Sequence, residues 1–217
     1  MPNKYLHVIT NFEEIGGAEK MLIKVINASE AKTQHTVVVL VAASELMKKQ
    51  INKKVEYHSL NAKNAIDLLY SAYKVRSMLR ASKFDVVYSW MYHANFVSAM
   101  AELFMPNKPT LIWGVRHSLD DLGGEGVSTK LAIYLGKMLR SVPSRVIYCS
   151  YRAMKQHVEF GYSAQNKSIY IPNGYDFDDY QPRLFQKGSL VLGAAGRFHD
   201  AKDYKTLFKA VAPILYK

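Results

Sequence analysis

The stretch Leu6-His7-Val8-Ile9-Thr10, followed after a short polar segment by Gly16-Gly17-Ala18-Glu19, contains the pattern from which the fold follows. Residues 6–10 form a short, mostly apolar run, typical of a strand buried on both faces in a parallel sheet. Apolar residues then recur at helical spacing from 18 to 26, which predicts an amphipathic helix packed on that strand. The segment is therefore a strand, a glycine loop and a helix.

The same alternation continues along the chain. Further strands are expected at 36–41, 55–60, 85–90, 110–116, 145–149 and 168–171, with helices over 65–79, from about 95, over 130–139 and over 151–160. Strands joined by crossover helices form a mostly parallel, doubly wound α/β sheet. Such sheets bind ligands beyond the carboxyl ends of their strands, so we expect the functional loops to follow strands.

The strand–helix pattern breaks after Pro172. The turn Pro172-Asn173-Gly174, several aspartates and Pro182 are typical of a linker. We therefore expect a first domain over 1–172, a linker over 173–188, and a truncated second domain over 189–217. That last segment is expected to be a β–turn–α unit built like the first, with Pro213 in its helix.

Length, composition and charge limit the class of protein. The 217 residues suffice for one domain of roughly 150 to 200 residues and little more. With 49% apolar and 22% charged residues and no repeats, the chain is an ordinary globular protein. The formal charge of +11 favours an anionic partner. Because no nucleic-acid-binding motif accompanies that charge, we expect no nucleic acid partner, and a peripheral contact with an anionic membrane fits better.

Cysteine usage and hydropathy indicate the compartment. The single cysteine, Cys149, cannot form an internal disulfide, which is typical of a reducing compartment. The sequence begins with no cationic and apolar leader, and no apolar run approaches the roughly 20 residues that span a bilayer. We therefore expect a cytoplasmic protein, at most peripheral on the inner face of the membrane.

Gly16 and Gly17 lie between the first strand and its helix. A side chain at either position would obstruct a ligand that approaches the helix N-terminus, so the geometry suits a phosphate or a sugar. The segment is neither a dinucleotide fingerprint nor a P-loop, because no G-x-G-x-x-G and no Gly-Lys-Ser or Gly-Lys-Thr is present. The alternative is a tight turn in which Glu19 complements the helix dipole.

Two other loops follow expected strands. Arg116-His117-Ser118 comes after residues 110–115, where His117 can donate a hydrogen bond to a sugar hydroxyl or stabilise charge at the reacting carbon. Trp90-Met91-Tyr92-His93 offers aromatic faces and polar tips to a carbohydrate or a lipid-linked acceptor. The alternatives are a polar loop residue for His117 and simple packing for Trp90.

Near the end of the chain, residues 190–195 run into Gly196-Arg197, and Lys202 follows at the start of a helix. Two cations and free backbone N–H groups converge there, which predicts a site for a diphosphate.

A metal site is not expected. Asp176-Phe177-Asp178 resembles the paired carboxylates that hold a divalent ion, but it directly follows a Pro-Asn-Gly turn, where solvated aspartates are the common outcome. No H-E-x-x-H motif and no paired cysteines are present.

Three segments taken together resemble the group 1 retaining glycosyltransferases of the GT-B fold. They are Gly16-Gly17-Ala18-Glu19, Ile171-Pro172-Asn173-Gly174-Tyr175-Asp176, and Gly196-Arg197 with Lys202-Asp203-Tyr204. The resemblance implies two Rossmann-like domains across a cleft, with the acceptor held by the first and the nucleotide-sugar donor by the second. A glycan or lipid-linked acceptor and a nucleotide-sugar are therefore the expected partners, with no cofactor.

The resemblance also implies residue roles. Arg197 and Lys202 match the pair that binds the donor diphosphate, and Gly16 and Gly17 match the loop that approaches the same phosphates. His117 matches the catalytic histidine beside the transferred sugar. The candidate acceptor-side residues are Glu19, Trp90, His93 and Arg116. A guanidinium and an ammonium stabilise a departing diphosphate without metal.

The remainder of the second domain, with its Glu-x7-Glu segment, is absent from this sequence, so we expect the 217-residue chain alone to be an inactive, truncated form. Two alternative functions remain open at this point. One is a non-catalytic domain that binds a glycan, a membrane or a partner subunit of a two-chain system. The other is a nucleotide-sugar epimerase of the same overall fold.

Overall fold

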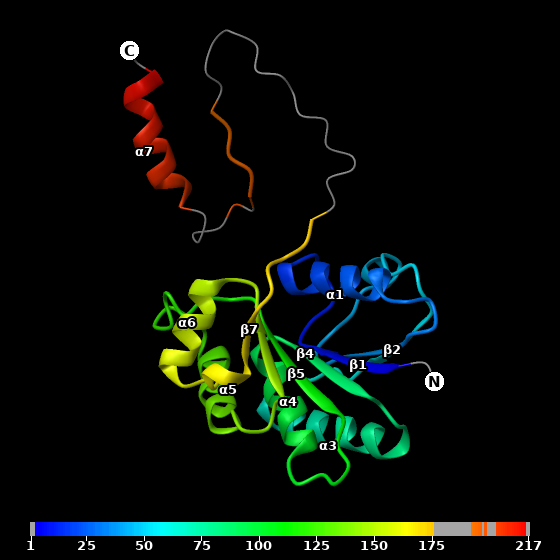
Figure 1. Cartoon of the computed structure of the whole chain (residues 1–217). Helices are drawn as coiled ribbons and strands as arrows, with labels where there is room; N and C mark the ends of the chain where they lie inside the picture. Colours follow the sequence, from blue (N-terminus) through cyan, green and yellow to red (C-terminus); the bar gives the residue numbers. More distant parts are fainter. Residues whose placement is uncertain (1–2, 176–191, 197, 199–202, 216–217) are drawn as a thin grey trace. The chain divides into compact units, whose positions relative to one another are not determined.

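The computed structural model describes residues 3–175, 192–196, 198 and 203–215 (Figure 1). The chain divides into two compact units, Met1–Tyr175 and Asp176–Lys217. The predicted boundary at residues 172–173 lies close to this division. Each unit is described by itself.

The first unit is built on a parallel sheet of seven strands in the order β3-β2-β1-β4-β5-β6-β7. The strands are β1 (Lys4–Ile9), β2 (Gln34–Val39), β3 (Val55–Ser59), β4 (Val86–Trp90), β5 (Thr110–Val115), β6 (Arg145–Tyr148) and β7 (Ser168–Tyr170). All seven predicted strands are confirmed, and the doubly wound α/β class with them. Their ends shift by one or two residues because a strand boundary depends on pairing with neighbours.

The strand order reverses at β1. This strand pairs in parallel with β2 on one side, Ile9 opposite Val39, and with β4 on the other, Ile9 opposite Trp90. After β1 the chain crosses toward β2, whereas after β4 it crosses toward β5 on the other side. The loops that follow these two neighbouring strands therefore separate at the carboxyl edge. This is the topological switch point at which doubly wound sheets bind ligands.

Helices cover both faces of the sheet. They are α1 (Gly17–Ala28), α2 (Glu45–Lys48), α3 (Ala65–Ala81), α4 (Tyr92–Glu102), α5 (Val127–Met138) and α6 (Tyr151–Phe160), with a short 3-10 turn at Gln165–Lys167. Figure 1 shows α1 over one face and α3 and α4 over the other. In β1, Leu6 and Val8 belong to the core under α3 and α4, whereas Ile9 belongs to the core under α1. Alternate side chains of a strand point to opposite faces, so one apolar strand contributes side chains to the cores on both faces of the sheet.

Helix starts differ most from the sequence-based expectation. Helix α4 begins at Tyr92 instead of about residue 95, directly after Met91, whose φ is 73°. No capping side chain marks that start, so local sequence does not signal it. The four-residue α2, which was not predicted, begins where Ser44 Oγ accepts a hydrogen bond from the Met47 amide.

In the second unit, the predicted helix is present as α7 (Tyr204–Leu215), with Pro213 inside it. The expected strand falls partly outside the described residues, and residues 192–195 have no strand pairing. A strand is defined by hydrogen bonds to a neighbour, and the described part of this unit supplies none.

Two buried histidines form a chain of hydrogen bonds under α1, which runs from Trp90 at the end of β4 to Ser29 after the end of α1. The Trp90 indole N–H donates to His7 Nδ1 at 3.4 Å, His7 Nε2 lies 3.1 Å from His35 Nδ1, and His35 Nε2 lies 2.8 Å from Ser29 Oγ. Because the indole N–H can only donate, His7 Nδ1 accepts and the His7 proton is on Nε2. His7 Nε2–H then donates to His35 Nδ1, so His35 also carries its proton on Nε2. Lys53 Nζ also donates to Ser29 Oγ, at 2.8 Å. Neutral imidazoles therefore satisfy the whole chain.

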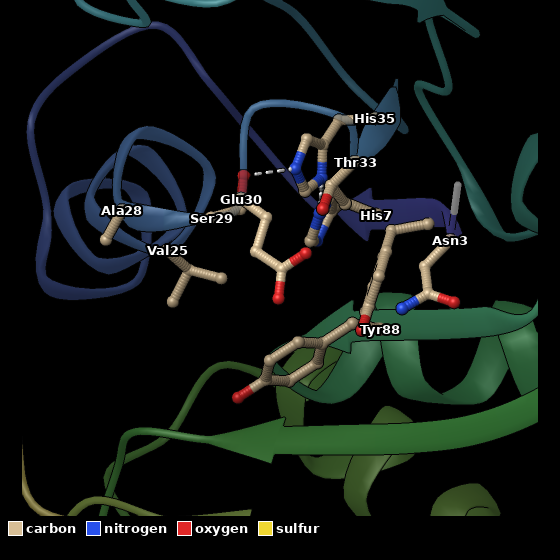
Figure 2. A pocket seen from close by; sticks show the side chains of 10 residues that line it. Asn3, His7, Val25, Ala28, Ser29, Glu30, Thr33, His35 and Tyr88 are labelled. Atoms are coloured by element: carbon tan, nitrogen blue, oxygen red, sulfur yellow. Dashed lines mark hydrogen bonds between the residues drawn. The ribbon is translucent and has the colours of Figure 1, made fainter. Parts of the chain in front are cut away.

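A cavity of about 420 Å³ adjoins this chain (Figure 2). Figure 2 shows His7, His35 and Tyr88 around it, with the bond from His35 to Ser29. Asn3 and Tyr5 also line it, which places it at the start of β1. It is therefore at the opposite edge of the sheet from the loops that follow the strands.

His157, on α6, is a third buried neutral histidine. Its Nδ1–H donates to the Ala153 carbonyl at 2.7 Å, and its Nε2 accepts from the Tyr92 hydroxyl at 2.8 Å. Burial lowers the pKa of His157 to about 4, and burial together with the nearby His35 lowers the pKa of His7 to about 3. In both cases protonation would place a proton on the ring nitrogen that accepts a hydrogen bond from a neighbouring side chain.

These shifts predict acid-sensitive folding. Below about pH 6.5 the unfolded chain binds protons at His7 and His157 while the folded chain does not, so the free energy of unfolding falls as pH falls toward about 4. Each histidine contributes a slope of up to about 1.4 kcal/mol per pH unit. Urea unfolding at a series of pH values measures this slope, and His157→Gln should reduce it by about one histidine's share.

The matched control is His58→Gln, since the His58 side chain is 38% exposed and pairs with Glu56. An unchanged slope in His157→Gln would contradict the assignment.

Candidate functional site

The loops after β1, β4 and β5 meet at the carboxyl edge of the sheet, where the sequence predicts the site. Gly16 is the N-cap residue of α1 and has an extended backbone, with φ of −109°. A Cβ at Gly16 would lie 2.3 Å from Glu19 Oε2, so the Glu19 carboxylate occupies the space beside this glycine. A Cβ at Gly17 would meet nothing within 4 Å. The first turn of α1 is therefore open at Gly17, while Glu19 covers Gly16.

His117 is held by an acidic partner. Its Nε2 lies 2.5 Å from Glu125 Oε1, and the imidazole side chain is 45% exposed. The Tyr92 ring meets the imidazole edge-on, with centroids 6.5 Å apart. A carboxylate that accepts the Nε2–H fixes the orientation of the ring. This arrangement leaves an exposed histidine in one orientation beside the strand ends.

Sequence reasoning missed Glu125. The residue lies in the glycine-rich segment 122–126 just before α5. The loop between His117 and Glu125 folds back, so that Glu125 contacts the imidazole. A carboxylate between glycines, shortly after a histidine that follows a strand, is the signal that would have indicated the pair.

Arg116 joins the β5 loop to the segment that leaves the sheet. Its guanidinium lies over the Trp90 ring, 5.3 Å from the centroid, and its Nη1 donates to Asn173 Oδ1. On the other side, Lys24 Nζ donates to the Gly174 carbonyl at 3.1 Å. Asn173 and Gly174, singled out as a linker turn, are thus held between α1 and the β5 loop. The end of the first unit therefore crosses the candidate site.

Trp90 and His93 occupy different surroundings, although both come from the same loop. Trp90 is fully buried and stacks on Tyr88, so packing accounts for it. His93 is half-buried, its Nε2 lies 2.8 Å from Ser128 Oγ on α5, and burial lowers its pKa. His93 also lines a cavity of about 720 Å³. Of this loop, His93 is the residue that a ligand can reach.

Three of the buried side-chain atoms that lack a hydrogen-bond partner among the described residues lie at this edge, and the others belong to Tyr57, Ser98, Glu102 and Trp113. Thr10 Oγ1, Asn11 Oδ1 and Arg116 Nε are buried atoms without a hydrogen-bond partner. All three follow β1 or β5 directly. Met91, after β4, has a backbone conformation that only glycine adopts easily, with φ of 73° and ψ of 171°. Unpaired buried polar atoms and local strain are costly, and they cluster where a ligand is bound.

Some predicted site residues lie outside the described residues. These are Arg197 and Lys202 of the predicted diphosphate site, and Asp176 and Asp178 of the acidic pair. Among the residues that are described, no group of three or more His, Cys, Asp or Glu side chains is arranged to hold a metal ion. The donor-side roles and the expected independence from metal therefore stay predictions.

Solved structures share this fold. The chain is similar to Alr3699/HepE from Anabaena in complex with UDP and glucose, at 18% identity and a TM-score of 0.61 over 80% of this chain and 45% of that chain. The apo form of the lipopolysaccharide outer core galactosyltransferase WaaB is 18% identical, with a TM-score of 0.62 over 81% of this chain and 47% of that chain. UDP-N-acetylglucosamine 2-epimerase from Rickettsia bellii is 15% identical, with a TM-score of 0.57 over 78% of this chain and 44% of that chain. The fold of the first unit is therefore that of one Rossmann-like half of a GT-B protein.

These coverages mean that the chain spans less than half the length of the solved structures it matches. No curated protein matches it by sequence. None of the helices in residues 3–175 or 203–215 is long and apolar enough to cross a membrane. A family model, however, matches residues 15–179, a segment that includes Gly16, His117, Glu125 and Asn173. The chain belongs to Glycosyltransferase Family 4.

Proposed function

We propose that the protein containing this chain transfers a sugar from a nucleotide-diphosphate-sugar to a glycan or lipid-linked acceptor, with retention of anomeric configuration. The observation that carries this proposal is the His117–Glu125 pair, 2.5 Å apart, at the carboxyl edge of a Family 4 fold. The open first turn of α1 at Gly17 supports it, because backbone N–H groups and the helix dipole favour an anion there.

In the proposed reaction, negative charge develops on the departing diphosphate, and the groups that bind the diphosphate can stabilise that charge. The bond between the anomeric carbon and the diphosphate oxygen breaks, and the acceptor hydroxyl oxygen forms the new bond to that carbon. The acceptor proton passes to the leaving diphosphate. Gly17 leaves the first turn of α1 open to the diphosphate, and Arg197 and Lys202 are proposed to neutralise its charge from the second domain without a metal ion.

His117 is proposed as the residue next to the transferred sugar. Its Nε2 is engaged by Glu125, so the ring is oriented before substrate binds. With its Nε2–H given to Glu125, the neutral imidazole presents Nδ1, which can accept a hydrogen bond from a sugar hydroxyl or face the positive charge that develops at the anomeric carbon. Glu125 acts through His117 and is a positioning residue.

UDP-sugars are the proposed donor class. The matched HepE structures hold UDP, glucose or UDP-glucose, which favours UDP as the nucleotide. We also propose a location at the cytoplasmic face of the membrane if the acceptor is lipid-linked. The net charge of +11 supports a contact with anionic lipid head groups.

A second candidate function is epimerisation of the nucleotide-sugar. Its support is the similarity to UDP-N-acetylglucosamine 2-epimerase structures, with a TM-score of 0.57 for the enzyme from Rickettsia bellii. An epimerase converts its substrate with no acceptor present, whereas a glycosyltransferase needs one. Analysis of products from the UDP-sugar alone separates the two functions.

In the full-length protein, His117→Ala should lower kcat for UDP release by about 10²-fold or more, because a positioned group at the reacting carbon is lost. Glu125→Gln should lower kcat less, because the oxygen of the side-chain amide can still accept the Nε2–H of His117 and hold the ring. UDP release in the presence of acceptor is the measurement, and proton NMR of the product reports the anomeric configuration. Asp120→Asn is the matched control, because Asp120 lies in the same loop and bonds Arg152 and Gln156 instead. Wild-type kcat in His117→Ala would contradict the assignment.

The 217-residue chain by itself should release no UDP from a UDP-sugar above the rate in buffer, because it spans less than half the length of the UDP-bound structures that it matches. Parallel assays of this chain and of the full-length protein test the expectation. Turnover by the short chain would overturn it. Activity that appears only when the short chain is mixed with a second polypeptide would favour a two-chain system.

A further inference from the structure

An apolar cavity of about 720 Å³ is lined by residues of α3, α4 and α5 and of the loop before α3. Phe96 on α4 contributes to it from the middle of the three helices. Leu68 and Leu69 line it from α3, and Leu131 and Leu135 line it from α5. The size is within the range of small-molecule sites, and the lining is predominantly apolar, so the occupant that fits is a hydrocarbon.

The helices on either side of the cavity expose apolar side chains to water at its rim. Leu69 on α3 is 53% exposed and Leu131 on α5 is 49% exposed, and both line the cavity. Ile66, three residues before Leu69, is 77% exposed, and Val127, four residues before Leu131, is 83% exposed. Contiguous exposed apolar surface on both walls of a hollow marks an interaction site.

The cavity reaches the carboxyl edge of the sheet, where the candidate site lies. Thr10, directly after β1, Val41, just after β2, and His93, near the start of α4, line it there. Thr10 Oγ1 is one of the buried atoms without a partner. His93 belongs to the acceptor-side set, and its bond to Ser128 ties α4 to α5 at the cavity wall. A chain in the cavity can therefore lead to a head group near His117.

Charge at the cavity favours an anionic head group. Lys63, in the loop before α3, lines the cavity and is exposed. Within the described residues, its ammonium has no hydrogen bond or ion pair. An ammonium beside an apolar hollow complements a molecule that joins a hydrocarbon chain to a phosphate.

We propose that this cavity binds the hydrocarbon chain of a lipid-linked acceptor, with Lys63 next to the phosphate of its head group. This inference rests on the proposed glycosyltransferase function and specifies its acceptor class. The chain enters between α3 and α5, and the head group stays at the carboxyl edge. A water-soluble glycan acceptor would leave the cavity and its apolar rim without an occupant.

Alkyl phosphates test the proposal without donor or turnover. Isothermal titration calorimetry of the 217-residue chain with butyl, octyl and dodecyl phosphate, each below its micelle concentration, measures Kd as a function of chain length. Each buried methylene should tighten binding by up to about four-fold. Octyl phosphate that binds no more tightly than butyl phosphate would overturn the proposal.

Substitutions at the walls locate the binding. Leu69→Gln and Leu131→Gln change partly exposed positions on two different helices, and each should weaken dodecyl phosphate binding by about ten-fold or more. Leu46→Gln is the matched control, because Leu46 is 73% exposed on α2 and does not line the cavity. Its Kd should equal that of the parent chain. Equal Kd values in all three variants would place the binding elsewhere and overturn the proposal.

The phosphate contact has its own test. Lys63→Gln should weaken dodecyl phosphate binding several-fold while leaving binding of an uncharged dodecyl glycoside unchanged. Equal weakening of both ligands would overturn the role of Lys63. Vesicles with and without phosphatidylglycerol separate two sources of the ligand: binding to anionic vesicles that survives Leu131→Gln indicates a surface contact instead of a chain in the cavity.

Because no donor is present in these titrations, their failure leaves the proposed function standing. UDP release with a water-soluble acceptor, together with absent alkyl phosphate binding, would reject the lipid acceptor alone. Alkyl phosphate binding in a protein with no UDP-sugar turnover would instead reject the glycosyltransferase function.

Discussion

The parallel pairing of β1 with both β2 and β4 is the constraint on which the rest of the structure depends. It fixes the direction of every strand, so all the loops that follow strands gather at one edge of the sheet. It also sends the chain in opposite directions on either side of β1, which opens space between the loops. His117, the first turn of α1 and the linker at Asn173 lie together because of this topology, although they are far apart in the sequence.

The buried polar groups under α1 differ from those at the carboxyl edge of the sheet. Under α1, Trp90, His7, His35 and Ser29 form a chain in which each donor has an acceptor, and the rings are neutral. At the carboxyl edge, Thr10 and Asn11 keep buried oxygen atoms unpaired, and Met91 has a strained backbone. A satisfied network stabilises a fold, whereas unpaired atoms lower stability unless a ligand completes them. This contrast supports function at the carboxyl edge and a structural role for the buried histidines.

Local sequence predicted some parts of the molecule well and others poorly. All seven strands and helix α6 over 151–160 follow from apolar runs and helical spacing, which are local properties. The start of α4 at Tyr92 does not, because it depends on a positive φ at Met91 that the sheet imposes. The pairing of His117 with Glu125 was missed because it depends on how the glycine-rich loop folds back. The roles of Arg197 and Lys202 stay predictions.

The sequence by itself determined the class of fold and the family, and it predicted the edge of the candidate site, since each depends on residue types in order along the chain. Tertiary structure alone decided which side chains a ligand can reach. It buried Trp90, set Arg116 between that indole and Asn173, and gave His117 an acidic partner. It also left a hollow between α3 and α5. The physical reason is that exposure and contact depend on how whole elements pack, and periodicity within one element does not specify its neighbours.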